Sequence, residues 1–161
     1  MERTPTVVLT CGLTSSGKST YAAKLEERGF VWLSLDQDAW DQGLTEHPLP
    51  ADAQKRMKIE QKQKLRDLIA AGRDVVLENA FASRSRRDEY RAIAEEAGAR
   101  VEIVYFEVPA EDLHDRLASR NAGPRGPHSV RVSHEQLDRW LAVFEPPTED
   151  EGPVTVIKSL D

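Results

Sequence analysis

Near its N-terminus the chain reads Gly12-Leu13-Thr14-Ser15-Ser16-Gly17-Lys18-Ser19-Thr20. Residues 12–19 match the G-x-x-x-x-G-K-[ST] pattern in full, and they lie between an apolar run and a helical pattern, which is the context that the pattern requires. The two glycines let the backbone turn so that its N–H groups point inward and form an anion nest at the positive end of a helix dipole. Lys18 supplies a mobile cation for the β- and γ-phosphates of a nucleotide, and the Ser19 hydroxyl can ligate Mg²⁺. The sequence therefore predicts a P-loop in which residues 12–20 bind nucleotide phosphates and Lys18 also takes part in catalysis.

Strand-length runs alternate with helical stretches along the rest of the chain. The runs are rich in β-branched and aromatic residues and cover 7–9, 31–33, 75–77, 101–106 and 154–157. The helical stretches cover 18–28, 52–71, 84–97, 110–120 and 133–144. This alternation implies right-handed βαβ crossovers and a parallel sheet covered on both faces. We therefore predict an α/β, three-layer P-loop NTPase fold with a five-stranded parallel sheet, helices on both faces and a small lid.

Length and charge limit the number of domains and the kinds of partner. The 161 residues, of which 39% are hydrophobic, suffice for one core, so we expect a single domain over 1–161 with the lid at about 116–133. The net charge of −6 excludes a general attraction to nucleic acid or anionic lipid. No apolar stretch approaches a bilayer span and the first residues lack a secretory apolar region, so we expect a cytoplasmic protein with no membrane partner. Cys11, the only cysteine, is interpreted as a buried, reduced core residue.

Two acidic residues follow predicted strands on the edge where the P-loop lies. The carboxyl ends of parallel strands open on one edge, so Asp36 after the second strand and Glu78 at the end of the third face the same crevice. A hydroxyl that attacks a γ-phosphate needs a carboxylate to orient it and accept its proton, which suits Asp36, with Asp38 as the fallback. Glu78 suits the Mg²⁺ or the acceptor. The alternatives are an N-cap of a turn over residues 37–40 for Asp36 and a structural hydrogen-bonding role at the strand end for Glu78.

Arginines gather in the segment that we expect to form the lid. Arg116 and Arg120 are four residues apart, so they share a helix face and can clamp a transferring phosphoryl group and the nucleotide. The alternative is a surface ion pair between Arg116 and Asp112. Two segments rich in glycine and proline, 41–50 and 121–132, are either binding loops or solvated connectors.

A second group of basic residues opens the helical stretch after the third strand. Arg84 and Arg87 in this group could hold an anionic or polar acceptor, although the interleaved acidic residues also fit a solvated helix N-terminus. Trp40 could line an acceptor pocket, although core packing is the default for a tryptophan. The basic residues of 52–71 are interpreted as the outer face of an ordinary amphipathic helix.

With these residues in place, the sequence resembles the small P-loop kinases that include the polynucleotide 5′-kinases, zeta toxins and chloramphenicol phosphotransferases. The resemblance runs from Thr6 to about Ile157. Besides the P-loop it rests on four segments, which are Ser34-x-Asp36, Val75-Val76-Leu77-Glu78-Asn79-Ala80-Phe81, Tyr105-Phe106-Glu107-Val108-Pro109 and Phe144-Glu145-Pro146-Pro147. It implies a fold related to adenylate kinase, Asp36 as the general base, and Arg116 and Arg120 as the arginines of the lid helix.

The sequence departs from that family at two informative positions. Glu78-Asn79 stands where the family often has Asp followed by Thr or Asn, and Ala39 stands where polynucleotide kinases carry an arginine three residues after the base. Neither Asn79 nor Asn121 begins the Asn-Lys-x-Asp sequence with which GTPases read guanine.

Together these features predict a kinase that uses ATP and Mg²⁺ and transfers the γ-phosphate to a hydroxyl group of a small-molecule acceptor. The net charge and Ala39 favour a small molecule. One alternative is a kinase for the 5′-hydroxyl of a polynucleotide, because the local arginines could bind nucleic acid. A second alternative is a non-catalytic regulatory module that only binds nucleotide.

Overall fold

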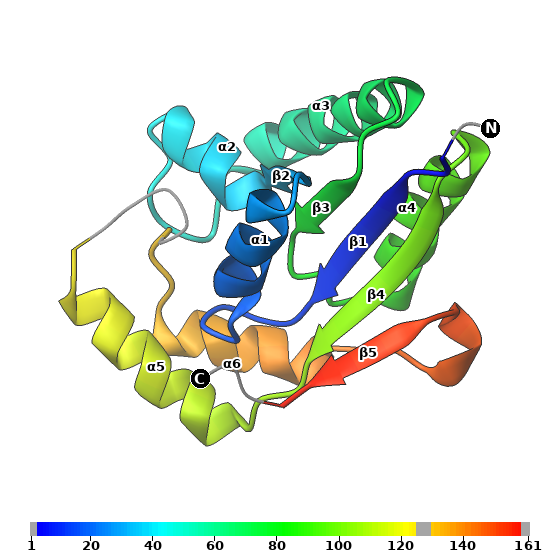
Figure 1. The fold of residues 1–161 in the computed structure, drawn as a ribbon. Helices are drawn as coiled ribbons and strands as arrows, with labels where there is room; N and C mark the ends of the chain where they lie inside the picture. The colour runs from blue at the N-terminus through cyan, green and yellow to red at the C-terminus, as the bar shows by residue number, and fades with distance from the viewer. Residues whose placement is uncertain (1–2, 125–129, 159–161) are drawn as a thin grey trace.

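A central sheet of parallel strands organises the chain in the computed structural model, which describes residues 3–124 and 130–158. The strands are β1 (Thr6–Cys11), β2 (Val31–Ser34), β3 (Val75–Glu78), β4 (Arg100–Phe106) and β5 (Val154–Ile157). Their order in the sheet is β2-β3-β1-β4-β5, and every neighbouring pair is parallel (Figure 1). The predicted five-stranded parallel sheet is confirmed.

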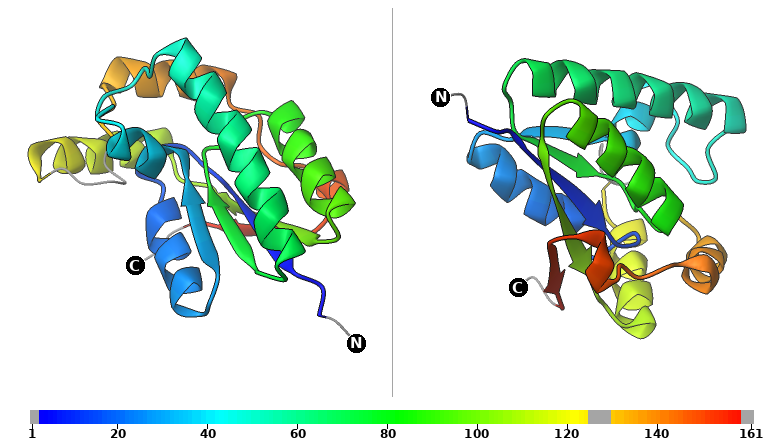
Figure 2. Two further views of the ribbon diagram at one scale, coloured as in Figure 1. Left: turned by 90° about the horizontal axis from the view of Figure 1, so that it is seen from above. Right: turned by 90° about the vertical axis from the view of Figure 1, so that its right-hand side faces the viewer.

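Helices cover both faces of this sheet. They are α1 (Lys18–Glu27), α2 (Leu35–Asp41), α3 (Ala51–Ala70), α4 (Arg84–Glu96), α5 (Ala110–Ala122) and α6 (His134–Val143), with a 3₁₀ turn η1 (Glu149–Glu151). Figure 2 shows α1 on one face of the sheet and α3 with α4 on the other, which gives the three predicted layers. Helices α5 and α6 lie beyond the tips of β1 and β4 (Figure 1).

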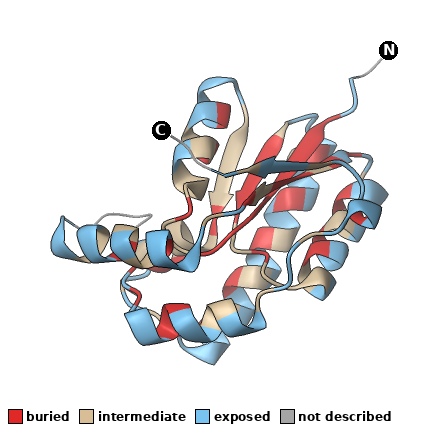
Figure 3. Cartoon of the chain, turned by 90° about the horizontal axis from the view of Figure 1, so that it is seen from below, coloured by how far each residue is buried: buried red, intermediate tan, exposed pale blue. Residues whose placement is uncertain are grey.

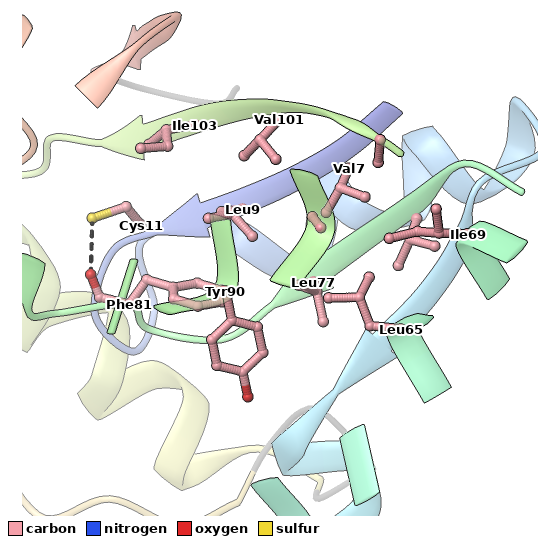
Figure 4. Packing of buried hydrophobic residues seen from close by; sticks show 13 residues of the cluster. Val7, Leu9, Cys11, Leu65, Ile69, Leu77, Phe81, Tyr90, Val101 and Ile103 are labelled. Atoms are coloured by element: carbon pink, nitrogen blue, oxygen red, sulfur yellow. Dashed lines mark hydrogen bonds between the residues drawn. The ribbon is translucent and has the colours of Figure 1, made fainter. Parts of the chain in front are cut away.

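The core follows from the alternation of side chains along β1. Val7, Leu9 and Cys11 pack toward α3 and α4, whereas Val8 packs toward α1, because successive residues of a strand point to opposite faces. Figure 3 shows buried residues along the central strands and on the sides of the helices that face them. Figure 4 shows the larger cluster, in which the Cys11 thiol donates to the Phe81 carbonyl at 3.3 Å. Cys11 is thus a buried free thiol, as predicted.

A short helix was missed by the sequence analysis, which expected only a turn after β2. Ser34, the last residue of β2, is the N-cap of α2, and its side chain accepts a hydrogen bond from the Gln37 N–H at 3.2 Å. The N-cap alternative for Asp36 is therefore wrong. Asp36 lies instead in the first turn of α2, two residues beyond the strand.

The segments 41–50 and 121–132 meet in space. The backbone N–H of His47 donates to the Arg131 carbonyl, and the N–H of Arg131 donates to the Thr45 carbonyl, both at 2.7 Å. Part of the expected lid belongs to α5, and residues 125–129 lie outside the described residues. Within 3–124 and 130–158, no helix has the length and apolar character that a bilayer crossing requires.

Candidate active site

A cavity of about 770 Å³ opens at the carboxyl edge of the sheet. One wall is the P-loop with the start of α1, and the opposite wall is α3 with residues 47–49. The end of β3 forms the floor, and side chains from α5 and α6 complete the enclosure. Since parallel sheets bind ligands outside the carboxyl ends of their strands, this is where the fold favours a site.

The P-loop has the strained backbone that its sequence predicts. Gly17 has φ 106° and is the N-cap of α1, and Ser15 also has a positive φ of 66°. A Cβ atom on Gly12 would lie 2.7 Å from Ser16 Oγ and 3.0 Å from Phe106 Cβ, so only glycine fits there without rearrangement. Ser15 Oγ is buried in the cavity wall and has no hydrogen-bond partner among the described residues. A phosphate oxygen would supply one, and the loop thus fits the group that its motif implies.

Ser19 and Glu78 provide oxygens suitable for Mg²⁺. The Ser19 hydroxyl donates to Glu78 Oε1 at 3.0 Å, and both residues line the cavity. Burial raises the pKa of Glu78, and the nearby charge of Asp36 adds to this, whereas the charge of Lys18 opposes it. A divalent cation at this point would favour the ionised carboxylate, and hydroxyl and carboxylate oxygens are ligands that Mg²⁺ accepts. The donor set therefore fits the metal.

Asp36 lies across the cavity from the P-loop and is held by a residue that the sequence analysis did not select. His47 Nε2 is 3.2 Å from Asp36 Oδ1, and the His47 ring packs edge-on against Trp140 with the ring centres 5.1 Å apart. Burial of the Asp36 carboxyl opposes ionisation, but the contact with His47 and the charges of Lys18 and Arg120 prevail and lower its pKa. Asp36 is therefore ionised at neutral pH, the form in which it can accept a proton.

Both arginines of α5 reach the P-loop. Arg116 Nη1 donates to the Ser15 carbonyl at 3.3 Å, and Arg120 Nη1 donates to Thr14 Oγ1 at 3.1 Å. Both side chains line the cavity. They lie where a phosphoryl group on the P-loop would meet them, and no bond between Arg116 and Asp112 accounts for their orientation.

The wall opposite the P-loop comes from residues that carried no recognisable motif. Gln54, Met57 and Lys58 of α3 line the cavity together with His47, and Trp140 of α6 closes it. Their spacing along α3 is that of one helix face, but this face would have looked like part of the core or of the solvated surface in the sequence alone. This face of α3 forms a cavity wall because α3 lies over the end of β3, which the sequence alone does not show.

Four residues expected to bind the acceptor do not line the cavity. Arg87 is completely buried and forms a two-bond ion pair with Glu151, with Nε to Oε1 at 2.7 Å and Nη2 to Oε2 at 3.2 Å. Arg84 turns outward to Asp150 and Asp88. These two placements correct the expectation, because acidic partners already occupy both guanidinium groups.

Asp38 and Trp40 also do not line the cavity. Both lie on α2 with Asp36. Asp38, two residues after Asp36, is turned to another face of the helix, whereas Trp40, four residues after it, shares the side of Asp36 but is not among the residues that line the cavity. The charged neighbours of Asp38 are Lys64, Asp41 and Glu60 rather than the P-loop lysine. Asp38 is thus not placed to serve as the fallback base, and Trp40 is not placed to line the acceptor pocket.

Comparisons with known proteins agree with this fold. Residues 7–147 match the family described as an AAA domain. No curated protein matches the sequence. A proposed kinase from Chloroflexus aurantiacus has a TM-score of 0.74 at 18% identity, with 97% of this chain and 89% of that chain covered.

Two further solved structures have similar scores. A gluconokinase from Sinorhizobium meliloti has a TM-score of 0.66 at 20% identity, with 98% of this chain and 84% of that chain covered. Kti12 from Chaetomium thermophilum, solved with ADP and aluminium fluoride, has a TM-score of 0.67 at 18% identity, with 94% and 88% covered. At these identities the likeness establishes the fold, and the predicted P-loop kinase architecture is confirmed.

Proposed function

Because the chain belongs to the P-loop kinase family whose AAA domain pattern spans residues 7–147, we propose that it transfers the γ-phosphate of ATP to a hydroxyl group of a small molecule. The observation that carries this proposal is the ionised Asp36 carboxylate, which shares one cavity with Lys18 and with the two arginines of α5. A site that only bound nucleotide would not need a carboxylate held by a histidine in the cavity beside the P-loop.

Different residues of the cavity bind the phosphates, accept the proton and hold the metal. The P-loop, with Lys18, Arg116 and Arg120, holds the phosphates and stabilises the charge that develops on the γ-phosphoryl group. The acceptor hydroxyl donates a hydrogen bond to Asp36, its oxygen forms the new bond to the γ-phosphorus, and its proton passes to Asp36. The bond between the γ-phosphorus and the β–γ bridging oxygen breaks, and ADP leaves with that electron pair. Ser19 and Glu78 would hold Mg²⁺, which neutralises phosphate charge when it is bound.

A small acceptor fits better than a polynucleotide end. The acceptor side of the cavity is enclosed by α3, by residues 47–49 and by Trp140 of α6. The chain carries a net charge of −6, which disfavours a long polyanion. We further propose that residues of about 116–133 act as the lid over the nucleotide and that the reaction takes place in the cytoplasm, where ATP and Mg²⁺ are abundant.

Labelled phosphate transfer from ATP to a panel of sugars, sugar acids, hydroxylated antibiotics and 5′-hydroxyl oligonucleotides tests this function. Asp36→Asn removes the proton acceptor at nearly constant shape, so kcat should fall roughly 10²- to 10⁴-fold while ATP affinity is kept. Asp38→Asn is the matched control, because Asp38 lies on the same helix outside the cavity, and it should keep wild-type rates.

Three results would contradict parts of this proposal. Unchanged transfer in Asp36→Asn would remove Asp36 as the base. Transfer only to oligonucleotides, with an affinity that falls steeply with salt, would favour the polynucleotide kinase. Tight ATP binding with no acceptor at all would favour the regulatory module.

A further inference from the structure

The cavity shares part of its wall with a second hollow of about 430 Å³. The two share lining residues, among them Lys58, Asn79 and Ala80. The P-loop lines only the first, and Arg86 and Tyr90 line only the second. Lys58 therefore stands where an acceptor that reaches Asp36 would extend away from the nucleotide.

Positive charge accumulates around Lys58. Burial lowers the pKa of this lysine, and the charges of Arg86 and Lys62 lower it further, while Glu89 alone acts in the opposite sense. Glu89 is already engaged by Lys62 Nζ at 2.9 Å and by Arg86 Nη1 at 3.5 Å. Three cations thus share one carboxylate, and Lys58 has no ion-pair partner in the ranges 3–124 and 130–158.

This surplus of positive charge is local, because the chain as a whole is negatively charged. The net charge is −6, and Glu145, the acidic residue among those that line the second hollow, is exposed. The other cations of the connected cavity, Lys18, Arg116 and Arg120, surround the P-loop, where nucleotide phosphates would occupy them. The positive charge of Lys58 can therefore bind a ligand other than the nucleotide.

From this arrangement we propose that the acceptor is a small hydroxylated acid whose carboxylate or phosphate is bound by Lys58 and Arg86 while its hydroxyl group faces Asp36. The proposal rests on the proposed kinase function and names the acceptor class for that same site. The charges at the two ends set the orientation, because Asp36 and Glu78 repel an acidic group from the reacting end. An acid bound the other way round would bring its negative group against these carboxylates and would lose the attraction of Lys58 and Arg86.

The two sources of the anionic group give two arms of one experiment. The probes are matched pairs of an acid and its neutral counterpart: gluconate with glucitol, glucuronate with glucose, and glycerol 3-phosphate with glycerol. For each pair, kcat/KM for phosphate transfer and the dissociation constant in the presence of a non-hydrolysable ATP analogue are measured. We expect at least one acid to be preferred over its neutral counterpart by about 10- to 100-fold, the range of one or two charge-assisted hydrogen bonds.

Variants then identify the side chains responsible for that preference. In Lys58→Gln and Arg86→Gln the ratio of acid to neutral should collapse toward one, mainly through KM or the dissociation constant, whereas Lys58→Arg should restore most of it. Lys55→Gln removes the same charge from an exposed position of the same helix outside the cavity and should keep the wild-type ratio. Thermal melting and ATP affinity report whether each variant is folded.

The outcomes separate this inference from the kinase function. Neutral probes used as well as the acids, an unchanged ratio in Lys58→Gln, or no acid bound in preference to its neutral partner would overturn the inference and leave phosphate transfer standing. Preference for a 5′-hydroxyl oligonucleotide over every small acid would also overturn it. Lys58-dependent binding of an acid without any transfer would support the subsite and count against the kinase.

Discussion

His47 connects the proposed base to the aromatic wall of the cavity. Its Nε2 atom contacts Asp36, and its ring packs on Trp140. His47→Phe keeps the aromatic packing and removes the contact, whereas His47→Gln keeps a donor at a similar reach.

We expect His47→Phe to raise the pKa of Asp36, because burial then acts against fewer opposing interactions. The acid limb of the pH–rate profile, where Asp36 takes up a proton, should move to higher pH, and kcat at neutral pH should fall about tenfold. His47→Gln should recover most of both effects. NMR titration of the Asp36 carboxyl measures the shift without any acceptor, and an unchanged titration in His47→Phe would refute the role of this contact.

Single residues were predictable where a strand fixes their position. Lys18, Ser19 and Asp36 follow the carboxyl ends of strands and Glu78 ends one, so local sequence was enough to bring them to one edge. His47 and Lys58 could not be found in this way. They reach the cavity because residues 41–50 bond to Arg131 and because α3 crosses the end of β3, and both are tertiary facts.

At the level of elements, one buried ion pair ties η1 to α4. Arg87 bonds to Glu151 with two hydrogen bonds, and its Nη1 also donates to the Phe81 carbonyl at 2.8 Å. The sequence analysis assigned Arg87 to the acceptor because it could not identify the true partner. Glu151 lies 64 residues later, in a 3₁₀ turn that no sequence pattern predicted. Helix α2 was missed for a similar reason, since seven residues are too few to display a helical period.

Glu151→Gln should cost about 3–5 kcal/mol of unfolding free energy, because it leaves the Arg87 charge buried without its partner. For a chain of this length we expect the melting temperature to fall by roughly 10 °C. Glu149→Gln, an exposed change in the same turn, is the control and should alter it little.

The same pair gives the stability a pH dependence. Burial opposes ionisation of Glu151, but the hydrogen bonds from Arg87 and the Thr148 N–H prevail and lower its pKa. A carboxyl whose pKa is lower in the folded state stabilises the protein above its unfolded pKa and loses this contribution as the pH falls through the folded value. Urea denaturation at pH 7 and at pH 3 should therefore show a smaller difference between wild type and Glu151→Gln at pH 3, and an equal difference would contradict the assignment.

Across the whole chain, nucleotide would join parts that are far apart in the sequence. The P-loop follows β1, and the arginines that contact it lie about a hundred residues later on α5. The order of strands and helices was predictable because each periodic run is long enough to be recognised, and the parallel sheet follows from their alternation. The segment between α5 and α6 offered no such pattern.

We expect ADP with Mg²⁺ to stabilise the protein by about 2.7 kcal/mol at a concentration one hundred times its dissociation constant, which corresponds to a rise in melting temperature of roughly 5–10 °C. Arg116→Ala with Arg120→Ala should reduce this rise at the same ADP concentration, because the nucleotide then loses its contacts with α5. Arg139→Ala, an exposed change on α6, should leave it intact. Thermal melts with and without ADP decide the matter, and an equal rise in the double variant would remove the arginines from the nucleotide site.

The direct passage from β2 into α2 has a practical consequence. Ser34 ends the strand and caps the helix, so no loop separates β2 from α2 and the position of Asp36 is fixed relative to the sheet. The surfaces that would select the acceptor belong instead to a loop and to the side of a long helix. If the proposed function holds, a protein engineer could therefore redesign substrate preference by grafting residues 48–58 from a relative while keeping His47 and Asp36, and an insertion between positions 34 and 36 would abolish the transfer for any acceptor.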